Sequence, residues 1–252
     1  MSLGRRKIAL DDQDRWVFNR MADAYMARPA YPAPLIDALV ELASGGTVID
    51  VGAGVGHVAL PLAARGLEVV AVEPALAMLE HLRETAKDRG LPLRAEHATA
   101  EALPLPDRTA ALIVIADALH FVDAELTAHE IARVLTPRGA LAIVTCELGA
   151  SPFMRALERV MAESAPRRPR RVDAALAQII SLARLRPLPA QRFEDETPVG
   201  AATLEEILRS ISFIGPAMSA ERFAAFRERI HALPGPAVWS RTFTLHAARR
   251  LR

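Results

Sequence analysis

Short aliphatic runs alternate with helical patterns through the first 145 residues, and this alternation restricts the fold more than any other feature of the chain. The runs are rich in valine, isoleucine, leucine and alanine, as strands buried on both faces are, and they lie at Thr47–Val51, Glu68–Glu73, Leu93–Ala98, Ala110–Ile115 and Gly139–Thr145. Helical periodicity fills the segments between them, at Pro34–Ala43, His57–Arg65, Pro74–Arg89 and Asp123–Leu135. Because helices connect successive strands, the pattern predicts an α/β fold with a doubly wound, mostly parallel sheet.

The pattern changes after Thr145. Further helices are expected at Phe153–Glu163, Val172–Leu185, Leu204–Ser210 and Ala220–His231, and further strands at Arg192–Val199 and Val238–Ala247. Polar and apolar residues alternate in the last run, which is typical of an antiparallel strand with one exposed face. We therefore predict a Rossmann-like sheet of seven strands whose last strand is antiparallel. Its parts are a core at 34–146, a helical cap insertion at 147–191 and a completing region at 192–252.

Composition indicates a globular chain whose partner is a small molecule. Of the 252 residues, 51% are hydrophobic and 24% charged, and 31 basic side chains nearly balance 30 acidic ones. A balanced charge is not typical of nucleic-acid binding, no apolar run is long enough to span a membrane, and the lone Cys146 cannot form an internal disulfide. We expect a cytoplasmic monomer or homodimer that binds neither nucleic acid nor membrane, and we assign no metal site.

Basic residues gather at one place in the insertion, at Arg167, Arg168, Arg170 and Arg171. Such a cluster can bind a phosphate, a nucleic acid or an acidic substrate, and it can equally be a solvated loop. We interpret it as a solvated loop, because the chain as a whole carries a net charge of only +1.

The strongest local motif is VIDVGAGVGHVAL, which runs from Val48 to Leu60. A buried strand passes directly into three glycines, Gly52, Gly54 and Gly56, and then into a helix. Glycines let the backbone turn tightly and approach a ligand closely, and a helix N-terminus presents unpaired N–H groups with partial positive charge. The motif predicts a nucleotide-like ligand, although a tight turn without a ligand uses the same residues.

Two residues bear on which nucleotide this is. Glu73 ends the next strand, 21 residues after Gly52, where a carboxylate can bind both hydroxyls of an adenosine ribose. Such a carboxylate serves NAD and S-adenosylmethionine alike. The dehydrogenase fingerprint has its third glycine at the sixth position of the loop, however, and His57 stands there, which disfavours a nicotinamide dehydrogenase.

With these residues the chain resembles the class I S-adenosylmethionine-dependent methyltransferases. The positions that match the cofactor-binding motifs of that family are Tyr25, Asp50, Gly52, Ala53, Gly54, Gly56, Glu73, Pro74, Met78, Thr99, Ala100, Glu101 and Ala116. The resemblance implies that Glu73 binds the ribose and that Met78 packs against adenine. Thr99 departs from the family, in which an acid at this position often accepts a hydrogen bond from the adenine amino group. Adenine binding is therefore expected to depend more on the Ala100 backbone and on Glu101.

Segments at both ends resemble the branch that includes trans-aconitate methyltransferases. The opening FNRMADAYMARPAYP, at 18–32, is similar to a helical lid that folds over the cofactor, which implies a lid at 1–33. At the other end, a Ser-x-Ser-aromatic element at 210–213 is similar to one in the same branch. In the class I family as a whole, the segment IVIADALHFVD, at 113–123, is similar to the stretch that lines the methyl-transfer pocket. The substrate-binding residues that these likenesses imply are Arg28, Tyr31, His120, Phe121 and Ser212.

The resemblance implies methylation of a small molecule at an oxygen, either a carboxylate or a hydroxyl, with S-adenosylhomocysteine as the second product. Methyl transfer from a sulfonium is an in-line displacement in which positioning supplies much of the acceleration. His120 is the candidate general base, or the donor that orients a carboxylate. Two alternatives stay open: a regulator that binds the cofactor without turnover, and an NAD-dependent oxidoreductase, whose catalytic residues are not found in the chain.

Overall fold

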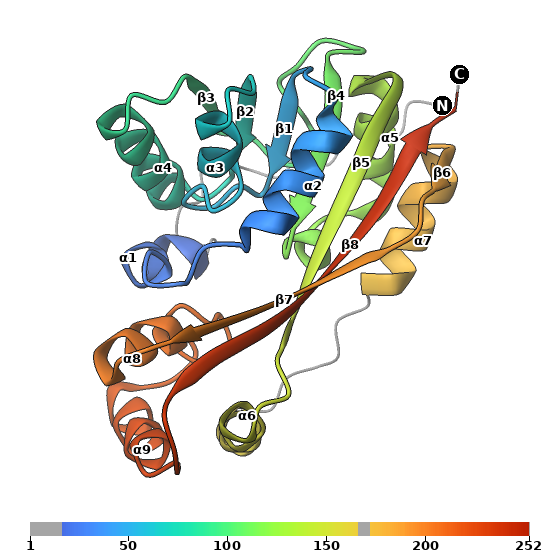
Figure 1. Ribbon diagram of the computed structural model, residues 1–252. Coiled ribbons are helices and arrows are strands. Elements are labelled where there is room, and N and C mark those ends of the chain that lie inside the picture. Colours follow the sequence, from blue (N-terminus) through green and yellow to red (C-terminus); the bar gives the residue numbers. More distant parts are fainter. Residues whose placement is uncertain (1–16, 166–171, 252) are drawn as a thin grey trace, which may run out of the picture.

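The computed structural model describes residues 17–165 and 172–251, and these residues form one sheet with helices on both faces (Figure 1). Its strand order is β3-β2-β1-β4-β5-β8-β6, and β7 also pairs with β8. The strands from β3 to β5 are parallel: β1 (Val48–Val51), β2 (Val69–Val72), β3 (Leu93–Glu96), β4 (Ala110–Ala116) and β5 (Leu135–Leu148). β8 (Val238–Arg250) is antiparallel to β5. The predicted α/β class with an antiparallel last strand is confirmed.

The sheet has eight strands, one more than predicted. The additional strand is β6 (Leu185–Pro187), and it pairs with β8 along the same edge as β7 (Gln191–Pro198). The predicted helix at Val172–Leu185 was too long. The observed helix α7 (Val172–Leu182) ends before Arg184, whose left-handed φ of +52° turns the chain out of the helix.

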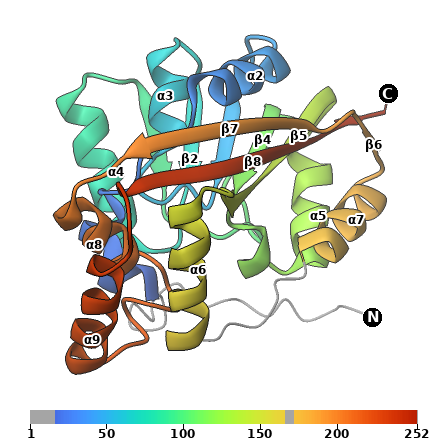
Figure 2. The same cartoon turned by 60° about the horizontal axis from the view of Figure 1, so that its bottom comes forward.

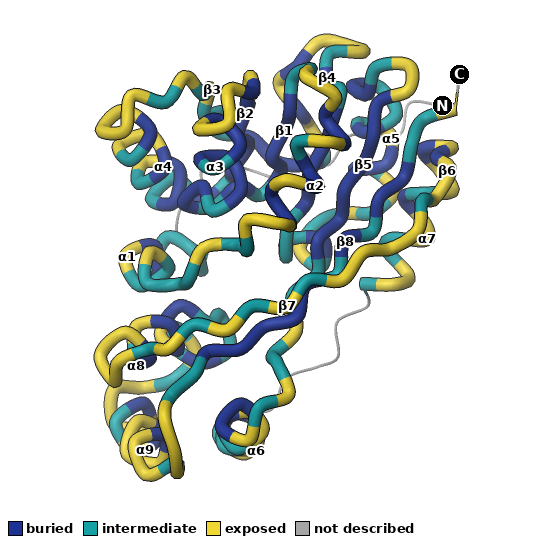
Figure 3. The backbone as a smooth tube through the Cα atoms, in the orientation of Figure 1, coloured by how far each residue is buried: buried dark blue, intermediate teal, exposed yellow. Residues whose placement is uncertain are grey.

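Helices bury both faces of the parallel strands. On one face α2 (Ala33–Ala43), α3 (Ala59–Ala64) and α4 (Leu76–Asp88) pack against the strands, and on the other face α5 (Ala124–Val134) and α7 do so. Figure 3 shows that the central strands are buried along their length. Burial on both faces explains why the strands appear in the sequence as continuous aliphatic runs rather than as alternating ones.

A smaller core lies beyond the ends of β5 and β8. It is enclosed by three helices that we call the cap: α6 (Pro152–Ser164), α8 (Ala201–Arg209) and α9 (Ala220–His231) (Figures 1 and 2). Trp239, at the start of β8, is buried with them. The predicted insertion at 147–191 is thus divided between two cores, because α6 belongs to the cap whereas α7 packs on the sheet.

The segment before α2 lies beside the glycine loop. It contains η2 (Val17–Met21) and α1 (Ala22–Tyr25), and Met21 is buried against Met78 of α4. The Asn19 Oδ1 atom accepts a hydrogen bond of 3.0 Å from the backbone N–H of Ala77, and α1 also contacts α8 of the cap. This N-terminal segment therefore touches both the sheet and the cap.

Two further expectations concern the arginine cluster and membrane-spanning segments. The arginine cluster at 167–171 lies outside the described residues. Within 17–165 and 172–251, no helix combines the length and the apolar character that crossing a membrane requires.

Replacing Gly56 with alanine tests the packing of the loop against the helices. Both Gly56 (φ +93°) and Gly66 (φ +81°) have left-handed backbones, but a Cβ on Gly56 would lie 2.9 Å from Leu60 and 3.1 Å from Leu82, whereas a Cβ on Gly66 meets nothing within 4 Å. We expect Gly66→Ala to cost about 1–2 kcal/mol of unfolding free energy, and Gly56→Ala about 1–3 kcal/mol more because it also overpacks the core. Urea unfolding measures both, and equal losses would contradict the packing argument.

Candidate functional site

The loop between β1 and α3 turns on three left-handed glycines. The φ angles of Gly52, Gly54 and Gly56 are +73°, +55° and +93°. A Cβ on Gly52 would lie 2.7 Å from the Cβ of Ala118, so a side chain has no room there. A Cβ on Gly54 would instead face the ring of Tyr25 at 3.9 Å, in the space where a ligand can meet the bare backbone.

Glu73, at the end of β2, is held in one orientation by this loop. Its Oε2 atom accepts a hydrogen bond of 2.8 Å from the backbone N–H of Gly54, and its Oε1 atom accepts one of 2.8 Å from that of Ala75. Burial raises the pKa of Glu73 to about 7, although both hydrogen bonds oppose the rise. Each oxygen keeps a second lone pair, so the carboxylate can accept two further hydrogen bonds from neighbouring hydroxyls.

Asp50 lies beneath the loop. It is 1% exposed, and burial raises its pKa to about 7 against a hydrogen bond from the Ala59 backbone. Its Oδ2 atom is buried and finds no hydrogen-bond partner in the described part of the chain. Because both Asp50 and Glu73 have a raised pKa, a positively charged ligand at this end of the site would favour their ionised forms, and the ionised carboxylates would in turn stabilise that ligand.

A groove, which we call the loop groove, crosses the ends of β1, β2 and β4. Gly52, Gly54 and Glu73 line it, and so do Phe18 and Tyr25 of the N-terminal segment. It encloses about 90 Å³, well below the roughly 300 Å³ at which ligand pockets begin. Two of its lining residues, Phe18 and Tyr25, come from the N-terminal segment, which therefore narrows the groove.

A larger cavity of about 600 Å³, which we call the cap cavity, lies between the sheet and the cap. One wall is apolar and is made by Met161, Ile211 and Trp239. The rest of the lining includes polar and charged side chains, which are those of Tyr25, Arg28, Tyr31, His57, Asp117, Glu147, Glu158 and Arg241. This volume lies within the range of about 300–1,000 Å³ typical of small-molecule sites.

The loop groove and the cap cavity share two residues, Tyr25 and Asp117. Asp117 follows β4 with a left-handed φ of +49°, and its backbone N–H donates to the carbonyl of Val144 at 2.8 Å. An aspartate in this conformation is uncommon away from turns and functional sites. The two residues mark the place where a ligand in the groove can meet a ligand in the cavity.

Two arginines fasten the N-terminal segment over this junction. Arg28 donates to the Oγ atom and the carbonyl of Ser210 at 2.7 and 2.8 Å and to the Tyr25 hydroxyl at 3.1 Å. Arg241 donates to the carbonyls of Pro29 and Ala30 and forms an ion pair with Asp195. Within the described ranges no acidic side chain pairs with Arg28, so its positive charge is available to a ligand in the cap cavity.

His57 is the functional candidate that the sequence interpretation missed, since we considered it only as a replacement for glycine. Its ring lies 5.7 Å from that of Tyr25, centroid to centroid. Burial, with the nearby charges of Arg28 and Arg241, lowers the pKa of His57 to about 4. The imidazole is therefore neutral at physiological pH. A polar ring directly after the glycine motif was the one signal that could have revealed it.

The predicted site residues fall into three groups. Those that line the loop groove are Tyr25, Gly52, Gly54, Glu73, Pro74, Met78, Thr99, Ala100, Glu101 and Ala116, together with Phe121, which was expected at the substrate. Arg28 and Tyr31 line the cap cavity. The third group lines neither space, and its members are Asp50, Ala53, Gly56, His120 and Ser212. Asp50 lies beneath the loop, and Ala53 and Gly56 are part of it.

His120 lies on η3 (Leu119–Phe121), where its ring packs 3.8 Å from that of Phe121, centroid to centroid. The adjacent Phe121 meets Phe18 edge-on at 5.1 Å across the loop groove. The short helix thus directs Phe121 rather than His120 into the groove. The role of His120 as a base stays a prediction, and the geometry favours His57 for it.

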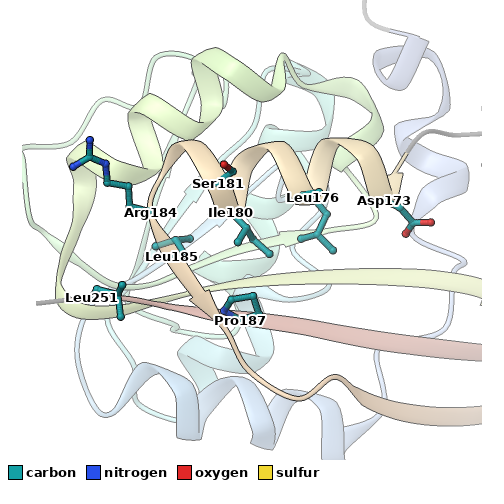
Figure 4. Close-up of a pocket in the computed structure, with 9 residues that line it drawn as sticks. Asp173, Leu176, Ile180, Ser181, Arg184, Leu185, Pro187 and Leu251 are labelled. Atoms are coloured by element: carbon teal, nitrogen blue, oxygen red, sulfur yellow. The ribbon is translucent and has the colours of Figure 1, made fainter.

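A third groove, of about 500 Å³, runs along α7 and β6 (Figure 4). Leu176, Ile180 and Pro187 give it an apolar floor, and Asp173 and Arg184 stand at its two ends. It shares no lining residue with the loop groove or the cap cavity. We therefore place the candidate site at the other two spaces.

Residues 49–143 match a family of proteins described as "Methyltransferase domain". An uncharacterized methyltransferase of Mycobacterium tuberculosis is 38% identical over 145 residues, which are 57% of this chain and 55% of the relative. The chain thus spans about half the length of the curated relatives it matches.

Solved structures share the fold. The YcgJ protein of Bacillus subtilis is similar with a TM-score of 0.60 at 20% identity, over 87% of this chain and 97% of that one. A geranyl diphosphate methyltransferase solved in complex with SAM is similar with a TM-score of 0.53 at 19% identity, over 92% and 85% of the two chains. At these identities the likeness shows the fold alone.

The substitution Asp50→Asn tests the raised pKa of Asp50 through the pH dependence of the unfolding free energy. Folded Asp50 keeps its proton up to about pH 7, whereas its usual pKa is 3.8, so the folded state loses stability as pH rises through this window. The asparagine has no such proton. We therefore expect the unfolding free energy of the variant, measured relative to that of the unsubstituted protein, to increase by roughly 2 kcal/mol from pH 5 to pH 8. Urea unfolding at the two pH values measures this change.

Asp88→Asn, at the exposed end of α4, serves as the control and should show the same difference from the unsubstituted protein at both pH values. An Asp50→Asn difference that does not change with pH would mean that folded Asp50 is already ionised at pH 5.

Proposed function

We propose, on the premise that residues 49–143 form a methyltransferase domain, that the chain transfers the methyl group of S-adenosylmethionine to an oxygen of a small molecule held in the cap cavity. The observation that carries the proposal is the meeting of two differently built spaces at Tyr25 and Asp117. One space is narrow and bordered by glycine backbone and a fixed carboxylate, and the other is larger and partly apolar. Group transfer needs such a junction between donor and acceptor.

The loop groove suits the parts of S-adenosylmethionine. Glu73 offers two oriented oxygens to the ribose hydroxyls, because Gly54 and Ala75 already hold it in place. Met78 and Thr99 line the groove where the base would lie, and the buried acids favour the cationic ligand. When bound, this cofactor supplies an electrophilic methyl group on a positively charged sulfur.

The cap cavity suits a small acceptor with polar and apolar ends. Arg28 and the two tyrosines present hydrogen-bond donors, and burial raises the pKa of Tyr25 and Tyr31, so both hydroxyls stay protonated. Donors of this kind recognise oxygen atoms, which supports an oxygen acceptor. Met161, Ile211 and Trp239 offer an apolar surface to the rest of the molecule.

Glu73→Ala tests the cofactor site, and Glu68→Ala is its matched control, since Glu68 stands at the opposite end of the same strand region and is exposed. Removing two hydrogen bonds to a carboxylate costs about 1.5–3 kcal/mol each. We therefore expect Glu73→Ala to weaken binding of S-adenosylhomocysteine at least about 100-fold in calorimetry, and Glu68→Ala to leave it unchanged.

NAD, titrated in parallel, should not bind. Unchanged affinity in Glu73→Ala, or binding of NAD in place of S-adenosylhomocysteine, would contradict the proposed cofactor. Binding of S-adenosylmethionine without methyl transfer to any acceptor would instead favour a regulator that uses the same groove.

A further inference from the structure

We infer that His57 contacts the acceptor itself, accepting a hydrogen bond and then the proton from its reacting group, so that the acceptor is a hydroxyl compound rather than a carboxylate. This inference rests on the proposed function and narrows its acceptor class. It also moves the role of base from the helix after β4 to the loop after β1.

The position of His57 is set by its neighbours in the chain. Gly56 before it is packed against Leu60 and Leu82, and Val58 after it is 2% exposed. Between these two fixed residues the imidazole emerges into the cap cavity. It lies beside Tyr25, at 5.7 Å between ring centroids and with the ring planes 34° apart. Because Tyr25 borders both spaces, His57 stands next to the junction that the methyl group must cross.

The surroundings keep the ring of His57 neutral. Burial disfavours its charged form, and the positive charges of Arg28 and Arg241 act in the same direction. The acids Asp117, Glu147 and Glu158 line the same cavity, but the net effect still lowers the pKa of His57. A neutral imidazole carries its hydrogen on one ring nitrogen, and the other nitrogen has a lone pair that can accept from a donor in the cavity.

A hydroxyl acceptor uses that lone pair. As its oxygen forms a bond to the methyl carbon, the carbon–sulfur bond breaks and its electron pair stays on sulfur, which becomes the neutral thioether of S-adenosylhomocysteine. The proton of the hydroxyl passes to the free nitrogen of His57. This hydroxyl proton becomes strongly acidic as the oxygen shares its electrons with the methyl carbon, so a weak base is enough to remove it.

The two arginines then favour loss of this proton to water once the product leaves, because they destabilise the charged ring. An ionised carboxylate has no proton to transfer and would gain nothing from His57. The neutral imidazole thus favours acceptors that arrive with an O–H group.

The experiment uses the full chain, methyl-labelled S-adenosylmethionine and a panel of phenols and alcohols, each paired with the carboxylic acid of the same carbon skeleton. We expect hydroxyl members to be methylated, and His57→Ala to lower their rate by about 100-fold or more with little change in S-adenosylhomocysteine affinity. His57→Gln, of similar size, should retain acceptor binding and lose rate. The variants should recover rate at high pH, where the acceptor loses its proton without help.

His129→Ala, on the exposed face of α5, is the control and should match the unsubstituted protein. Three results would each overturn the inference. The first is equal methylation of the hydroxyl compounds with and without His57, and the second is methylation of the carboxylic acids alone. The third is no methylation of any panel member despite normal binding of S-adenosylhomocysteine. A loss of rate in His120→Ala but not in His57→Gln would return the role to His120. Failure of the unsubstituted protein to bind S-adenosylhomocysteine would instead overturn the proposed function.

Discussion

The parallel arrangement of β1, β2 and β4 is the constraint on which the rest of the site depends. Because these strands run in the same direction, the residues that follow them meet at one edge of the sheet. The glycine loop, Glu73 and Asp117 are each the continuation of one of these strands. The hydrogen bonds from the Gly54 and Ala75 backbones to Glu73 then join the first two of these turns into one rigid unit.

The N-terminal segment completes the site through apolar packing and through the hydrogen bonds of two arginines. Arg28 reaches from it to Ser210 beside the cap, and Arg241 reaches from β8 back to the carbonyls of Pro29 and Ala30. Asp195 neutralises Arg241, so this buried arginine acts as a structural fastener, whereas Arg28 keeps its charge for a ligand. Burial above all, together with the nearby positive charges of Arg28 and Arg241, lowers the pKa of His57 and keeps its ring neutral.

Most of the fold was predictable, because its signals are local. The aliphatic runs of the five parallel strands and the glycine turn follow from residues close together in the sequence, and so does Glu73 at the end of β2. The strand β6 was missed because three residues next to a helix carry no periodicity of their own. The division of the insertion between two cores was missed as well, since the helical pattern of α6 does not say which surface it covers.

The sequence by itself determined the α/β sheet, the glycine loop and the acid that follows it, because hydrophobic periodicity and left-handed turns are properties of short segments. Only the tertiary structure decided which histidine faces the cap cavity. His57 and His120 occupy equivalent-looking positions after parallel strands, yet η3 packs His120 against Phe121, while the loop presents His57 to the cap cavity. The electrostatics of His57 likewise depend on residues distant in the sequence, because only the fold buries the ring and brings Arg28 and Arg241 close to it.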